Sequence, residues 1–320
     1  MSRIGFIVPA ALFAVTAITS NAVLSQDYPS KPIRIVAPGL GGSGDFASRL
    51  IAQGISGPFG QQVLIDNRPT GVIQAEAVYK AAPDGYTLLV AGGSVWIFPL
   101  LRKTVYDVVR DFAPITMVER APLLLAVHSS MPIKSVKDLI ALAKARPGEL
   151  NYSTTGIGSS FHLAAELFGS MAGIKLVHIA YSGSGTAVSA LLSGEVQLQL
   201  GSPTALSEHV KSGRLRALAV TSAEPSVLVP GLPTIAASGL PGFEVLGITG
   251  MWAPAKTPAP VISKLNQEVA RVLNSPDVKQ AFFSRGAEAV GGSPEQLAAA
   301  IKADVARMSK VIKDIGLRLD

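Results

Sequence analysis

Residues 32–50 read PIRIVAPGLGGSGDFASRL, and this stretch predicts how the chain folds. The β-branched run Ile33–Val36 predicts a short strand, and the glycines between residues 39 and 44 predict a turn. We expect Asp45 to be the N-cap of a helix over residues 46–55, because its carboxylate can accept backbone N–H groups of the first helical turn. A strand, a glycine turn and a helix N-terminus together direct N–H groups and a positive dipole end at one point, which favours a bound anion.

Similar turns follow three other predicted strands. Residues 154–160, TTGIGSS, come after a strand at 150–153 and precede a helix that we expect to begin at Phe161. Residues 181–186, YSGSGT, stand between a strand at 177–180 and another predicted helix. Gly92–Ser94 follows a buried strand at 86–91. Serine and threonine hydroxyls add donors to the backbone N–H groups, so each turn is a candidate part of an anion site.

The order of the predicted elements indicates an α/β protein with two domains. Strands and helices alternate from residue 33 to 91 and again from 136 to 221, which is typical of mostly parallel sheets covered by helices. We assign residues 26–125 and 236–320 to domain 1 and residues 126–235 to domain 2. The proline-rich residues 222–260 are interpreted as the return crossing. Ligands of such sheets bind beyond the carboxyl ends of the strands, where the glycine turns lie.

Composition excludes several classes of protein. The chain has 320 residues, is 48% hydrophobic and carries a net charge of +6. The basic residues are scattered and not interleaved with aromatic ones, so we expect no nucleic-acid partner. Cysteine is absent, which excludes disulfides and thiolate metal sites.

The first 25 residues have the pattern of a secretory signal peptide. Arg3 is followed by an apolar run over residues 4–18, and Val23–Ser25 offers small residues for cleavage before Gln26. The apolar run is shorter than the ~20 residues that a membrane span needs. We therefore expect an exported, periplasmic protein.

A dinucleotide-binding oxidoreductase is the alternative interpretation of the first turn. Gly39–Gly44 is a GxGxxG motif after a strand, and Asp66 ends the next strand about 20 residues later, as the dinucleotide fingerprint requires. Export, the looser turn after Pro38 and the lack of a recognisable hydride-transfer centre count against this function. The alternative predicts nucleotide binding that depends on Asp66.

Other catalytic chemistry has little support. The four histidines show no metal-binding spacing, no GxSxG elbow is present, and no pair of carboxylates suggests acid–base catalysis. We expect a protein that is not an enzyme, with no metal and no cofactor.

Many stretches in one order connect this chain with a known family. They include YPSKPIRIVAP, GGSGDFASRL, DNRP, AYSGSGTAVSALLSGEV and GRLRALAVTS, and they cover nearly the whole chain after the signal peptide. In these stretches the chain resembles the Bug-type solute-binding receptors of tripartite tricarboxylate transporters. The resemblance implies a type II periplasmic-binding-protein fold with a ligand cleft between two α/β domains. It also implies a small organic acid as ligand and membrane transporter subunits as partners. We expect the protein to be a monomer.

The same resemblance implies which residues bind the ligand. The first turn and the region of residues 153–162 would face each other across the cleft and hold a carboxylate mainly through N–H groups and hydroxyls. The expected site consists of Gly41, Gly42, Ser43, Asp45, Ser94, Thr155, Gly156, Gly158, Ser159, Ser160, His162, Tyr181, Ser184 and Ser202.

Some positions depart from the family pattern. Leu40 stands where the family has proline, and residues 94–98, SVWIF, are more aromatic than usual. These changes leave the ligand's identity open and allow a bulkier or more aromatic acid. We expect hinge closure near residues 123–127 and 222–236. A receptor that serves a regulatory partner instead of a transporter has the same sequence features.

Overall fold

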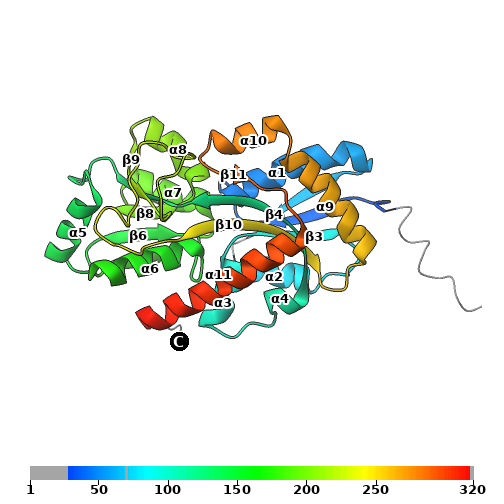
Figure 1. Cartoon of the computed structure of the whole chain (residues 1–320), viewed down its shortest axis with the longest axis horizontal. Helices are drawn as coiled ribbons and strands as arrows, with labels where there is room; N and C mark the ends of the chain where they lie inside the picture. Colours follow the sequence, from blue (N-terminus) through cyan, green and yellow to red (C-terminus); the bar gives the residue numbers. More distant parts are fainter. Residues whose placement is uncertain (1–27, 69–70, 318–320) are drawn as a thin grey trace, which may run out of the picture.

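The computed structural model describes residues 28–68 and 71–317, which form two β-sheets with helices on both faces of each (Figure 1). The predicted signal peptide, residues 1–25, lies outside the described residues. We call each sheet with its helices a lobe. In Figure 1 the first lobe is on the right and the second is on the left, joined by strands β4 (Phe112–Pro122) and β10 (Leu246–Pro254).

The first sheet is mixed, with the strand order β11-β4-β10-β3-β1-β2. Its parallel part pairs β1 with β2 and β3, and β10, β4 and β11 extend it by antiparallel pairing. The remaining strands of this sheet are β1 (Ile33–Ala37), β2 (Val63–Asn67), β3 (Thr87–Ala91) and β11 (Glu288–Ala289).

The second sheet has the order β7-β6-β8-β5-β9. Strand β6 is parallel to β7 and β8, whereas β5 is antiparallel to β8 and β9. The strands are β5 (Leu124–His128), β6 (Asn151–Thr154), β7 (Val177–Ala180), β8 (Leu198–Gly201) and β9 (Leu215–Val220).

Alternating strand residues build a separate core on each face of each sheet. In β1, Ile33 and Ile35 belong to one cluster and Val36 to the opposite one. In β5, Leu125 and Leu124 divide in the same way. This alternation is the two-residue period of a strand buried on both faces.

Helices of the first lobe cover both faces of its sheet. One face packs against α1 (Ser43–Phe59), α9 (Ala259–Leu273) and α10 (Pro276–Phe283). The other packs against α2 (Val72–Tyr79), α3 (Ser94–Leu101), α4 (Val108–Asp111) and α11 (Pro294–Ile315).

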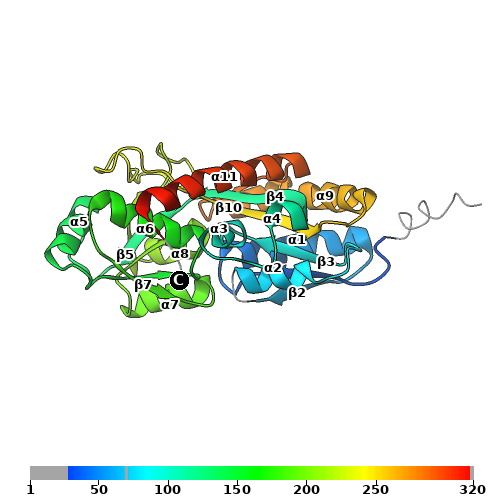
Figure 2. The ribbon, with the colours of Figure 1, turned by 90° about the horizontal axis from the view of Figure 1, so that it is seen from below.

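The second lobe is covered by α5 (Val136–Ala145) and α6 (Ser160–Ala172) on one face and by α7 (Ser184–Ser193) and α8 (Pro203–Lys211) on the other. The long helix α11 packs on β4 and contacts both α3 and α6, so it extends over both lobes (Figure 2).

Two chain segments cross between the lobes and meet at one buried residue. Leu123 alone separates β4 from β5, and residues 221–245 lead from β9 to β10. Thr221 Oγ1 accepts the N–H of Leu123 at 2.7 Å and donates to the carbonyl of Val245 at 2.6 Å. The two crossings are thus joined by hydrogen bonds and not only by proximity.

The structure differs from the sequence-based description at three elements. Strand β10 lies in the middle of the first sheet, within the proline-rich residues 222–260 that were interpreted only as the return crossing; its glycines and Pro254 weaken the local strand pattern, and pairing with β3 and β4 overrides it. Residues 94–101 form α3, a helix that the sequence analysis did not predict after the turn at Gly92–Ser94. Helix α1 begins at Ser43 with Gly42 as its N-cap, so Asp45 lies inside the first helical turn.

Candidate functional site

A narrow cavity of about 70 Å³ lies between the two lobes, where the glycine turns of both sheets meet. Its polar wall is made mostly of hydroxyl groups, and Ala121, Leu123, Phe161 and Ile248 supply the apolar part. Of the fourteen predicted site residues, the cavity wall includes Gly42, Ser43, Ser94, Thr155, Ser159, Ser160, Ser184 and Ser202.

Five helices begin at this cavity. The wall includes residues at the N-termini of α1, α3, α6, α7 and α8, two helices of the first lobe and three of the second. Only α6 has a side-chain cap, in which Ser159 Oγ accepts the N–H of His162 at 3.1 Å. The other four N-caps make no side-chain hydrogen bond. First-turn N–H groups that make no other hydrogen bond are then available to an anion, whereas the N–H of Gly185 in α7 is already bonded to the carbonyl of Leu40.

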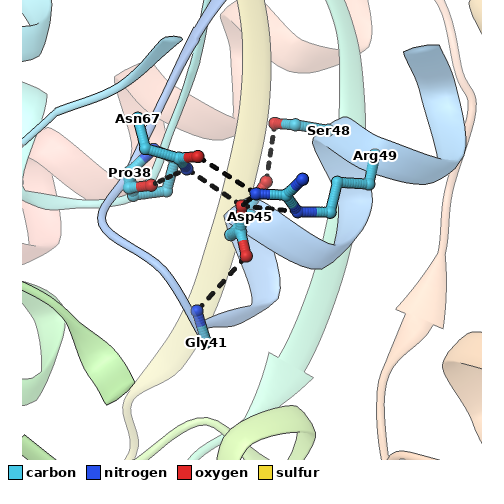
Figure 3. A network of polar contacts seen from close by, with 7 residues as sticks. Pro38, Gly41, Asp45, Ser48, Arg49 and Asn67 are labelled. Atoms are coloured by element: carbon cyan, nitrogen blue, oxygen red, sulfur yellow. Dashed lines mark hydrogen bonds and ion pairs between the residues drawn. The ribbon is translucent and has the colours of Figure 1, made fainter. Parts of the chain in front are cut away.

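Asp45 holds the first turn from within α1 (Figure 3). Its carboxylate accepts the N–H of Gly41 at 3.2 Å, Asn67 Nδ2 at 2.9 Å and Arg49 Nε at 3.0 Å. Asn67 Nδ2 also donates to the carbonyl of Pro38 at 2.7 Å. Gly41 and Asp45 are therefore next to the cavity wall but not part of it, and their contacts fix the shape of the turn.

The first turn also touches the turn before α7 directly. Gly185 N–H donates to the carbonyl of Leu40 at 3.0 Å. A Cβ atom on Gly39 would lie 2.8 Å from the carbonyl oxygen of Ser182, and one on Gly42 would lie 2.5 Å from Ser184 Oγ. The two lobes are therefore in contact over backbone atoms at the cavity edge, and side chains on these glycines would keep them apart.

The turn before α6 lies against α3 of the other lobe. Gly158 has a φ of +76°, and a Cβ atom there would lie 2.9 Å from the Cα of Phe98. A Cβ atom on Gly93 would lie 2.1 Å from Ser160 Oγ. Gly156 and Gly158 are outside the cavity wall, so they shape this turn and its contact with the first lobe.

His162 lies behind the turn in a cluster of titratable side chains. Its ring is buried and packs on His178 with 4.3 Å between ring centroids, and its Nδ1 faces the N–H of Gly158 at 3.4 Å. His178 Nε2 is 2.6 Å from Thr154 Oγ1. Burial lowers the pKa of both imidazoles to about 4, so both are neutral near pH 7. His162 therefore supports the turn without a charge.

Tyr181 also lies outside the cavity wall. Its hydroxyl donates to Glu195 at 2.8 Å, and its ring packs against the cluster between α7, α8 and their strands. The structure thus separates the predicted residues into eight on the wall and six that support it: Gly41, Asp45, Gly156, Gly158, His162 and Tyr181.

The sequence analysis missed Glu119, which lies on the cavity wall at the middle of β4. Its side chain is 3% exposed, and burial raises the pKa of its carboxyl group to about 7, partly offset by a hydrogen bond from Ser43. The available signal was an acidic residue within the apolar run of residues 112–127. Glu119 Oε2 and Ser202 Oγ are buried and have no hydrogen-bond partner.

The acidic residue of the dinucleotide fingerprint is engaged elsewhere. Asp66 forms ion pairs with Arg68 at 3.0 Å and Arg34 at 3.7 Å. The Gly39–Gly44 turn packs against the second lobe, in place of the open turn that a pyrophosphate would need. Neither feature favours the nucleotide alternative.

Comparison with known proteins identifies the family of this chain. Residues 47–317 match the model of the tripartite tricarboxylate transporter family receptor. The chain belongs to this family. BugT of Bordetella pertussis is 36% identical over 314 residues, which cover 96% of each chain.

Two solved structures that contain a bound carboxylate have the same fold. Rpa4515 of R. palustris, with adipate, is 36% identical with a TM-score of 0.87, covering 91% of this chain and 99% of that one. MatC of Rhodopseudomonas palustris, with malate, is 29% identical with a TM-score of 0.85, covering 89% of this chain and all of that one, 100%. The predicted Bug-type family and periplasmic-binding fold are confirmed.

Within residues 28–68 and 71–317, no helix is long and apolar enough to cross a bilayer. In the same residues, no cluster of three histidine or acidic side chains is arranged to hold a metal ion.

Proposed function

We propose that this receptor captures a small organic anion in the periplasm and delivers it to a tripartite tricarboxylate-type membrane transporter. The ligand's carboxylate binds in the cavity between the lobes, where the N-termini of five helices meet and four lack a side-chain cap. This convergence carries the proposal, because N–H groups and helix dipoles stabilise an anion without a cationic side chain. The signal-peptide pattern supports export, and adipate and malate in the two solved relatives support a carboxylate ligand.

In this proposal the receptor acts by closure and not by catalysis. The lobes separate about the crossings at Leu123 and residues 221–245, admit the ligand and close over it. The six supporting residues keep the turns in the shape that accepts a carboxylate, and the receptor works as a monomer without metal or cofactor.

A binding screen tests the carboxylate function. The chain from Gln26 onward is unfolded to remove bound ligand, refolded and titrated calorimetrically with mono-, di- and tricarboxylates and with nicotinamide cofactors. A carboxylate at 100 times its Kd stabilises the fold by about 2.7 kcal/mol, which thermal unfolding detects. Binding of a nicotinamide cofactor without any binding of acids would instead support the dinucleotide alternative.

Ser202→Ala tests the cavity itself. Because Ser202 Oγ is buried without a partner, removing it should leave stability equal or slightly higher, while carboxylate affinity falls about fivefold, or ~1 kcal/mol, through the lost hydrogen bond. Thr257→Val is the matched control, since Thr257 Oγ1 is likewise buried and unpartnered but lies outside the cavity wall. Equal ligand affinity in the wild type and Ser202→Ala would contradict the assignment of Ser202.

A further inference from the structure

Glu119 is an unusual feature of a cavity that is otherwise suited to an anion. Among the described residues on the cavity wall, it alone has a charged side chain. It lies in β4 opposite Thr249 of β10 and Ala289 of β11, neither of which is titratable. The helix N-termini and hydroxyls of the wall therefore suit a negatively charged group, whereas the carboxyl group of Glu119 suits a positively charged one.

The carboxyl group of Glu119 is not paired with a cation in the described part of the chain. Oε2 is buried without a hydrogen-bond partner, and the protein group that hydrogen-bonds to the carboxyl group is the Ser43 hydroxyl. Several charged side chains on the elements packed against β4 are paired away from Glu119: Asp45 with Arg49, Arg110 with Asp111, Arg120 with Glu288, Glu268 with Arg271, and Asp304 with Arg307. Lys264 of α9 donates to the carbonyl of Tyr28 at 2.6 Å. Burying an ionised carboxylate without a counter-charge costs free energy. A positively charged group beside Glu119 would offset this cost, and the described residues do not supply one.

We propose that the ligand supplies this group: Glu119 accepts the ammonium of a small amino acid whose carboxylate lies at the helix N-termini. This inference rests on the proposed function and narrows its ligand class. A zwitterion matches both kinds of group on the cavity wall, because its carboxylate accepts from N–H donors and its ammonium donates to Glu119. The short carbon chain then contacts the apolar side chains of Ala121, Leu123 and Ile248.

A second carboxylate on the ligand is disfavoured at the same place. It would approach ionised Glu119 as a like charge, and it could be accepted only if Glu119 were protonated and donated a hydrogen bond. The two arrangements have opposite pH dependence. Ammonium binding strengthens as Glu119 loses its proton near pH 7, whereas dicarboxylate binding weakens.

Calorimetric titration with matched four-carbon acids separates these arrangements. The probes are 2-aminobutanoate, 4-aminobutanoate, 2-hydroxybutanoate, butanoate and succinate, each measured at pH 6 and pH 8. We expect at least one amino acid to bind tenfold or more tightly than its hydroxy or unsubstituted analogue, and more tightly at pH 8 than at pH 6.

Glu119→Gln provides the variant arm, because glutamine keeps the side-chain volume and removes the charge. We expect it to weaken amino-acid binding at least thirtyfold, to change butanoate binding less than threefold, and to abolish the pH dependence. Ser202→Ala, in contrast, should weaken the binding of all of these acids by a similar factor. Thermal unfolding of both variants establishes that they are folded, and the wild-type pH dependence tests the inference independently of any variant.

Each outcome has a distinct meaning. If acids bind but the amino group adds nothing, the proposed function stands and the inference about Glu119 is wrong. If succinate is preferred at pH 6 and its affinity becomes independent of pH in Glu119→Gln, whose amide NH2 donates in the same place, then protonated Glu119 donates to a second carboxylate and the ammonium proposal is wrong. If no acid binds to the wild type, including in the wider carboxylate screen, both proposals are wrong.

Discussion

Asp45 determines the shape of the first turn although it is not on the cavity wall. Its carboxylate accepts hydrogen bonds from Gly41, Arg49 and Asn67, which come from the turn, the next turn of α1 and the end of β2 (Figure 3). A single side chain thus joins three segments. The predicted role as N-cap was wrong, but the same carboxylate still satisfies a backbone N–H of the turn, that of Gly41.

Asp45→Ala tests this role at the residue scale. The variant leaves Asn67 and Gly41 with fewer acceptors, so we expect a loss of about 1–3 kcal/mol in the free energy of unfolding and weaker carboxylate binding. Urea unfolding and calorimetry measure the two effects. Glu208→Ala, which removes an exposed ion pair with Lys211, should change stability by less than ~0.5 kcal/mol. A stability change for Asp45→Ala as small as that of Glu208→Ala would show that the hydrogen bonds of Asp45 are not needed for stability.

At the element scale, the contact between the turns before α1 and α7 requires glycine. Gly39 does not have a positive φ, so alanine is compatible with its backbone, but a Cβ atom would lie 2.8 Å from the Ser182 carbonyl oxygen and 3.1 Å from the Cα of Gly183. Both neighbours are backbone atoms of the other lobe, which cannot move away as a flexible side chain can. A side chain at this contact would therefore change the position of one lobe relative to the other, and not the fold of either lobe.

Gly39→Ala should hinder closure while each lobe remains folded. We expect ligand affinity to fall at least tenfold, or about 1.4 kcal/mol, and the free protein to be more open in small-angle X-ray scattering. The control is Gly57→Ala in α1, where a Cβ atom would meet nothing within 4 Å and helix propensity predicts a gain of up to ~1 kcal/mol in stability. Unchanged affinity in Gly39→Ala would mean that binding does not require this contact.

For the whole molecule, the buried histidines connect stability with pH. In the unfolded chain an imidazole takes up a proton below pH 6.5, but burial lowers the pKa of His162 and His178 to about 4 in the folded protein. Between these values the unfolded state binds more protons, so folding stability rises with pH. The contribution of these two neutral histidines to folding stability is complete above pH 6.5 and is lost as the pH falls toward 4. The pH dependence that Glu119 gives to folding stability has the opposite sign, because burial raises its pKa. Its contribution to stability is complete below about pH 4.5 and is lost as the pH rises through about 7.

His162→Gln should therefore reduce the sensitivity of stability to acid. We expect the wild type to lose about 2–3 kcal/mol more than this variant between pH 7 and pH 4, because glutamine has no proton to gain. Urea unfolding at a series of pH values measures the difference. Parallel curves for the two proteins would show that His162 does not titrate as its burial indicates.

The features that could be predicted from the sequence are local: strands ending in glycine and hydroxyl turns, helices beginning there, and the motif order shared with one family. These features depend on residues near one another in the chain, as for Ser135, whose hydroxyl accepts the N–H of Asp138 and caps α5. Tertiary structure alone decided that five of these helix starts surround one cavity and that β10 crosses the first sheet. It also decided that Glu119 is buried without a cation. The physical reason is that strand pairing and desolvation depend on neighbours more than a hundred residues away, as for Glu119 and its partners Thr249 and Ala289.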